Sequence, residues 1–88
     1  MKKLNAQEAK EIGNNLGIHW EDIPLDEFTK GINVELEHGT RYLETNVTNH
    51  DKALTGKIAW AHLKEFPDYY TRLEKMENEA EVYWNKNK

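Results

Sequence analysis

The chain has 88 residues, a net charge of −4 at pH 7 and no cysteine. A chain of this length is expected to form one domain, here residues 1–88, with a thin core that depends on its aromatic side chains. The acidic balance argues against non-specific nucleic-acid binding, which needs a basic surface, and the lack of cysteine excludes disulfides and thiolate metal sites. No apolar run follows the first residues. We therefore expect a cytoplasmic protein without a signal peptide or a membrane span.

The first predicted helix covers about Ala6–Leu16. Asn5 and Glu8 have the spacing of a capping box, in which each side chain accepts a hydrogen bond from the other residue's backbone N–H. Gly17 is suited to the left-handed conformation that often ends a helix. Apolar or small residues recur between these ends at helical spacing: Ala9, Ile12, Gly13 and Leu16.

A second helix is predicted to start at Leu25 or Asp26 and to end at His38, with Gly39 as its C-terminal stop. Gly31 inside this helix costs about 1 kcal/mol relative to alanine. Such a glycine indicates that another helix approaches closely at this point. The apolar stripe of the helix consists of Leu25, Phe28, Ile32 and Leu36.

Residues Thr40–Asn49 have no clean period of either kind, so they are predicted to form an irregular loop with at most a short extended piece at Thr45–Thr48. A loop of this length is often functional. The third helix is expected to start after Thr48 or Asn49, with Asp51 in its first turn.

The third helix is predicted to be the most buried one, because its apolar arc is wide. His62 and Glu65 lie on this inward arc, whereas Trp60 lies off it and could pack on the second helix or mark a surface for a partner. The arc has two adjacent apolar sides: Leu54, Ile58 and Ala61, and Ala59, Leu63 and Phe66.

Pro67 predicts a corner after the third helix, because proline cannot continue a helix but suits the first turn of a new one. A fourth helix is expected from there to about Trp84. These elements predict an all-α protein, a compact bundle of about four helices with an irregular loop between the second and the third. The cleanest apolar stripe of the chain lies on the fourth helix: Tyr69, Leu73, Met76, Ala80, Tyr83 and Trp84.

Two polar pairs suggest a candidate metal site. Glu35 and His38 are three residues apart on one helix, and His62 and Glu65 repeat this spacing in reverse order. Glu-x-x-His is a unit of carboxylate metal sites in helical bundles. Two antiparallel helices could bring the pairs together and offer two imidazoles and two carboxylates to zinc, iron or manganese.

Two other interpretations of the same residues stay open. His62 can be a core histidine that is hydrogen-bonded to Glu35 or to a tyrosine hydroxyl, because a buried polar group needs a partner. In that case Glu65 reaches the surface or caps the end of its helix, and His38 sits at a helix C-terminus. A catalytic use of His62 as a general base is the third interpretation. We assign no catalytic residue, since serine and cysteine are absent and no nucleophile motif is present.

Four stretches together resemble a small family of bacterial and bacteriophage proteins that is classified as a domain of unknown function. The resemblance covers most of the chain and implies a compact cytoplasmic domain of bacterial or phage-related origin. It implies no activity and no site. The stretches are Glu35–Gly39, Thr45–Thr48, Thr55–Ala59 and Ala61–Tyr70.

The leading functional hypothesis is a non-enzymatic interaction module that binds a protein partner. Its basis is the small size, the acidic surface, surplus aromatic residues such as Trp60, and the lack of a complete catalytic set. The alternative is a metal-binding helical protein, with hydrolysis as its activity. The sequence leaves the partner's identity and the oligomeric state open.

Overall fold

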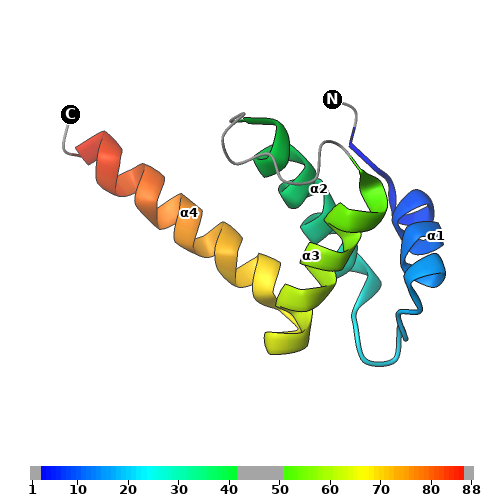
Figure 1. The fold of residues 1–88 in the computed structure, drawn as a ribbon. Coiled ribbons are helices and arrows are strands. Elements are labelled where there is room, and N and C mark those ends of the chain that lie inside the picture. Colours follow the sequence, from blue (N-terminus) through cyan, green and yellow to red (C-terminus); the bar gives the residue numbers. More distant parts are fainter. Residues whose placement is uncertain (1–2, 42–50, 87–88) are drawn as a thin grey trace.

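The computed structural model describes residues 3–41 and 51–86. They form four α-helices, α1 (Ala6–Leu16), α2 (Leu25–Arg41), α3 (Lys52–Glu65) and α4 (Tyr69–Lys86), and no β-strand occurs within these two stretches (Figure 1). The prediction of an all-α fold with a long connection between the second and third helices is therefore confirmed.

The helices α1, α2 and α3 pack around one core, which α4 joins through its first turns. Gly31 of α2 lies directly against the Tyr70 ring of α4, so closely that a β-carbon at this position would collide with the ring. The close approach predicted at Gly31 is thus confirmed. The buried apolar side chains of the core are Leu4, Ala9, Ile18, Ile23, Phe28, Ile32, Leu36, Ala59, Leu63 and Tyr70.

Both predicted ends of α1 are confirmed. The Asn5 side chain accepts a hydrogen bond from the Glu8 backbone N–H at 2.9 Å, and the Glu8 carboxylate accepts one from the Asn5 backbone N–H at 3.1 Å. Gly17 has a φ of 89°, in the left-handed region, and ends the helix. These signals are local, so the sequence was sufficient to locate them.

Two other helix boundaries differ from the prediction. The helix α2 continues through Gly39 to Arg41, because a glycine can keep helical dihedral angles at a cost of about 1 kcal/mol. Asp51 is the N-cap of α3 rather than part of its first turn, and its side chain accepts the Leu54 backbone N–H at 3.0 Å. The extended piece considered at Thr45–Thr48 lies outside the described residues.

The helix α3 is less buried than predicted. Leu54 and Phe66 are 46% and 50% exposed, and Ala61 is exposed as well. The buried strip of α3 is narrower than its apolar arc, because the other helices cover only part of that arc. The buried residues of this helix are Thr55, Gly56, Ala59 and Leu63.

The predicted corner at Pro67 separates α3 from α4, which begins at Tyr69. Glu74 and Glu77 of α4 still lie beside α2, and the last turns of α4 extend away from the other three helices (Figure 1). Asp68 immediately precedes α4 and accepts a hydrogen bond from Arg72 Nε at 2.8 Å, which lowers the pKa of the Asp68 carboxyl. None of the helices in residues 3–41 and 51–86 has both the length and the apolar character needed to cross a membrane.

Candidate functional site

Three helices contribute one polar side chain each to a cluster beside the core. The Tyr70 hydroxyl of α4 donates a hydrogen bond to Glu35 Oε2 of α2 at 2.8 Å. His62 Nδ1 of α3 lies 2.9 Å from Tyr70 Oη and 3.3 Å from Glu35 Oε2. We call this group the Glu35–Tyr70–His62 cluster. His62 contacts both of the predicted partner types, a glutamate and a tyrosine hydroxyl, but it is partly exposed and is not a core histidine.

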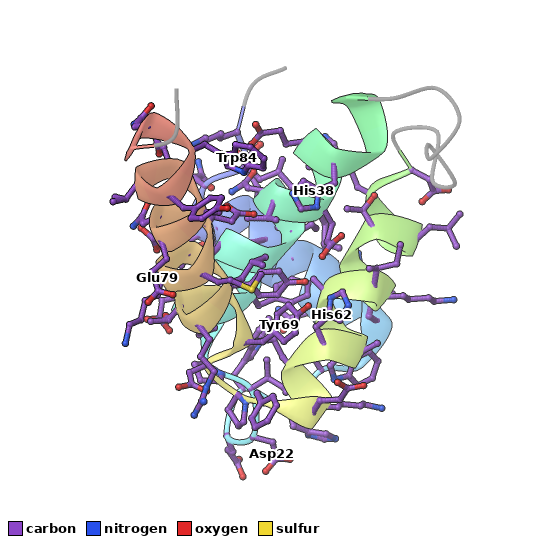
Figure 2. The ribbon with its side chains drawn as sticks, turned by 90° about the vertical axis from the view of Figure 1, so that its left-hand side faces the viewer. Asp22, His38, His62, Tyr69, Glu79 and Trp84 are labelled. Carbon is purple, nitrogen blue, oxygen red and sulfur yellow. The ribbon has the colours of Figure 1, made fainter. Side chains whose placement is uncertain are left out.

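The oxygen atoms around His62 Nδ1 favour one tautomer of the imidazole ring. Tyr70 has one hydroxyl hydrogen and donates it to Glu35, so His62 Nδ1 faces two oxygen atoms. This arrangement is attractive only if Nδ1 carries a hydrogen. The imidazole is stacked on the Tyr69 ring, with centroids 4.4 Å apart (Figure 2), and the His62 side chain is 33% exposed. Nδ1 is therefore the nitrogen through which His62 joins the cluster.

Tyr70 is the most constrained member of the cluster. It is only 2% exposed, with its ring against Gly31 and its hydroxyl between Glu35 and His62. Burial raises the pKa of the Tyr70 hydroxyl far above its ordinary value, and the negative charge and hydrogen bond of Glu35 raise it further. Tyr70 therefore remains a hydrogen-bond donor in the folded protein, which keeps α4 tied to α2.

A second carboxylate of α2, Glu27, holds the start of α4. Glu27 is buried, and its Oε1 accepts the backbone N–H groups of Tyr70 at 3.1 Å and Thr71 at 3.2 Å. Its Oε2 accepts the Thr71 hydroxyl. The first N–H groups of a helix lack partners within the helix, and negative charge is favourable there. Glu27 therefore acts as an N-cap supplied by another helix, while Asp68 pairs with Arg72.

Sequence reasoning did not identify Glu27 as a cap for the start of α4. Glu27 and Thr71 are 44 residues apart in the chain. No local spacing relates them, so no sequence motif of the usual kind could have revealed this contact.

The four predicted metal ligands do not all meet. Glu35 and His62 are in contact, whereas His38 Nε2 lies 4.0 Å from Glu77 of α4 and Glu65 is exposed at the end of α3. Among the residues that the structure describes, no group of three or more potential ligands is placed to hold a metal ion. Metal binding by these four residues stays a prediction.

Trp60 packs partly against the core instead of standing on the surface. Its ring is half-buried and the Lys64 ammonium lies 4.3 Å from the ring centroid. The ring lines a pocket of about 370 Å³ together with Asp22 and Pro67 among other residues. Trp60 therefore leaves only part of its ring accessible to a partner.

The larger exposed aromatic surface lies on the second half of α4. Met76 and Tyr83 are each 59% exposed and Trp84 is 66% exposed. Together with exposed Ala80 they continue the stripe that begins with half-buried Tyr69 and Leu73. We call Met76, Ala80, Tyr83 and Trp84 the exposed α4 face. Trp84 lies on the side of α4 toward α2, whereas Glu79 points away from the body (Figure 2).

Fold and site together define a small all-α protein whose last helix is anchored at one end and exposed at the other. A family described as "Protein of unknown function (DUF5661)" matches residues 9–79, and the chain belongs to this family. This match confirms the predicted membership of a family of unknown function. The match ends at Glu79, before Tyr83 and Trp84. No curated protein and no solved structure matches the chain.

Proposed function

We propose that the protein is a non-enzymatic interaction module that binds a helix of a partner protein on the exposed α4 face. The observation that carries the proposal is the exposure of Met76, Tyr83 and Trp84 on one stripe of one helix. Scattered apolar residues on a surface are ordinary, but a contiguous group indicates an interaction site.

The residue types support protein binding. Tyrosine, tryptophan and methionine are enriched in protein interfaces, and tryptophan and tyrosine are frequent binding hot spots. The Tyr83 and Trp84 rings lie edge to face with centroids 5.4 Å apart, which gives the C-terminal part of the face a continuous aromatic surface. The helical spacing of the stripe suits a partner that also presents an apolar helix face.

The architecture of α4 supports the same use. Its first turn is fixed to α2 through Glu27 and Tyr70, so the exposed half projects from a rigid base. A short helix segment gains most of its stability from the packing of its apolar face. A partner helix would therefore stabilise this segment and cover its apolar residues at the same time.

The test uses a neutral probe. A synthetic helix with leucine at heptad positions a and d and glutamine at the flanking positions is titrated into ¹⁵N-labelled protein. We expect the indole N–H signal of Trp84 to shift, while the signals of Trp20 and Trp60 stay in place as internal controls. A peptide of the same composition with scrambled order should cause no shift.

Variants, with the affinity for the leucine helix measured by isothermal titration calorimetry, locate the binding surface. Trp84→Ala should weaken binding by about thirtyfold, since a tryptophan hot spot contributes about 2 kcal/mol. Asn78→Ala, on the opposite and exposed side of the same helix, should leave the affinity unchanged. Equal losses in both variants, or shifts confined to Trp20 and Trp60, would contradict the proposal.

Metal binding through Glu35, His38, His62 and Glu65 is the alternative function. The contact of His62 Nδ1 with Glu35 Oε2 at 3.3 Å favours it, because it brings one imidazole and one carboxylate of this set together from two helices. A metal-binding protein would carry stoichiometric zinc, iron or manganese by elemental analysis, and a chelator would lower its Tm. A metal-free protein with an unchanged Tm would exclude this alternative.

A further inference from the structure

We infer that the partner helix carries basic residues on both flanks of its apolar stripe. The inference rests on the proposed function, since it concerns the charge of the helix that binds the exposed α4 face. Two observations lead to it: acidic residues border this face on both sides, and the outward one of them, Glu79, forms no ion pair within the described residues.

The spacing of the face defines its flanks. Met76, Ala80 and Tyr83 follow one another at intervals of four and three residues, which is the a/d spacing of a heptad. Glu77 then lies on one border of the stripe and Glu79 on the other, at the e and g positions. In helix pairs these positions meet the flanking residues of the partner and determine which partner is accepted.

The charge of the exposed segment is strongly one-sided. Residues 73–85 contain four glutamates and one lysine, which gives a net charge of −3. Within residues 3–41 and 51–86, Glu79 and Glu81 take part in no ion pair, whereas Glu74 lies 3.5 Å from Lys30. Glu77 lies 4.0 Å from His38, a contact that gains charge attraction only when the imidazole is protonated.

A second copy of this chain fits the face poorly. In an antiparallel pair of two such segments centred on Glu79, the midpoint of residues 73–85, each Glu79 lies beside its counterpart. Glu77 of one copy then lies beside Glu81 of the other. Like charges placed together oppose pairing, so the face favours a different chain with lysine or arginine at these positions.

The length of the face sets the size of the partner segment. Residues 73–85 span about 20 Å at 1.5 Å per residue, so a partner helix of roughly four turns covers the stripe. Its apolar stripe meets the aromatic residues, and its basic flanks meet Glu77 on one side and Glu79 on the other.

The experiment compares three synthetic helices that share one leucine stripe and differ only in the flanking residues, which are lysine, glutamine or glutamate. Affinities are measured from the Trp84 indole signal. We expect the lysine helix to bind about tenfold more tightly than the glutamine helix, as two or three exposed ion pairs would provide. The glutamate helix should bind most weakly, and 0.5 M NaCl should reduce the differences by screening.

Reversing the charges of Glu77 and Glu79 tests whether the exposed α4 face causes the preference for the lysine helix. The double variant Glu77→Lys/Glu79→Lys should bind the glutamate helix more tightly than the lysine helix. The matched control Glu11→Lys/Glu21→Lys, which changes the net charge equally at two exposed positions away from α4, should keep the original order. Circular dichroism checks that both variants remain helical.

The outcomes separate this inference from the proposed function. If the glutamine and glutamate helices bind as tightly as the lysine helix, the face is a docking site without the charge preference and the inference is wrong. If the control pair also loses the preference, the effect is one of net charge and the inference is equally wrong. A Trp84-dependent dimer in sedimentation experiments would overturn it as well. If none of the three helices shifts the Trp84 signal, the proposed function itself fails.

Discussion

The two halves of α4 have opposite environments. At the first turn, Tyr70 is buried and polar groups from α2 hold the backbone and the hydroxyl. Beyond Met76 the helix is exposed, although its stripe is apolar and aromatic. The helix is thus fastened by buried hydrogen bonds at one end, and its apolar surface is left accessible at the other. Glu27 and Glu35 of α2 thus hold the start of α4, whereas the apolar residues from Met76 onward are not part of the core.

The largest expected effect concerns the anchored half. Tyr70→Ala should lower the free energy of unfolding by about 3–5 kcal/mol, because it removes a large buried ring and leaves Glu35 and His62 without their shared partner. Urea denaturation measures the loss. Trp84→Ala in the exposed half should change stability by less than about 0.5 kcal/mol. Similar losses in the two variants would show that the exposed half also packs on the core.

The Glu27 cap should be the next most sensitive element. Glu27→Ala leaves the backbone N–H groups of Tyr70 and Thr71 unsatisfied beside the core, and we expect a loss of about 2–3 kcal/mol in urea denaturation. Glu79→Ala is the exposed counterpart and should cost no more than about 0.5 kcal/mol. If Glu27→Ala were as mild as Glu79→Ala, α4 would not depend on this cap.

His62 provides a third measurement of the anchored half. His62→Ala removes the hydrogen bonds of the ring and its stacking on Tyr69, so the free energy of unfolding should fall by roughly 1–3 kcal/mol. Glu65→Ala, at an exposed position on the same helix, is the control and should have little effect. An unchanged stability for His62→Ala would indicate that the residue serves function instead of structure.

The raised pKa of Tyr70 predicts that the free energy of unfolding falls at alkaline pH. Above about pH 10 the unfolded chain loses this tyrosine proton whereas the folded chain retains it, so the free energy of unfolding falls as pH rises. The contribution is at most about 1.4 kcal/mol per pH unit, and it is fully present only below the pKa of the unfolded chain. Urea titrations between about pH 9 and 11 should show a smaller slope for Tyr70→Phe than for the wild type. Equal slopes would contradict the assignment.

The smallest effect concerns local opening of α4. Amide hydrogens of Glu79–Trp84 should exchange faster than that of Leu73, because local stability falls where buried contacts are few. Hydrogen exchange followed by NMR resolves the two groups. Addition of the docking helix should slow the exchange of the outer group in particular, whereas uniform protection along α4 before addition would remove the contrast between its two halves.

Sequence reasoning succeeded where the signal and its effect lie within one turn or one stripe. The capping box of Asn5 and Glu8 and the left-handed Gly17 are such cases. Gly31 is intermediate: the residue indicated a close approach, but only the structure identified Tyr70 as the group that approaches. The stop expected at Gly39 was wrong, because a glycine permits a helix end without requiring one.

The candidate site depended on contacts between distant parts of the chain. The spacing of Glu35 and His62 on their helices made a meeting plausible, but the relative placement of α2, α3 and α4 added the Tyr70 hydroxyl to them and left His38 and Glu65 elsewhere. Periodicity likewise identified the apolar stripe of α4 without revealing how much of it is covered. Coverage depends on the direction in which α4 leaves the corner at Pro67.

Helical periodicity, capping residues and the proline corner were thus enough to establish four helices and an all-α fold, because the forces behind them act between neighbours in the chain. The Glu27 cap, the Glu35–Tyr70–His62 cluster and the exposed α4 face were decided by tertiary packing. Each arises from the relative placement of helices, and a pattern within one helix carries no information about that placement.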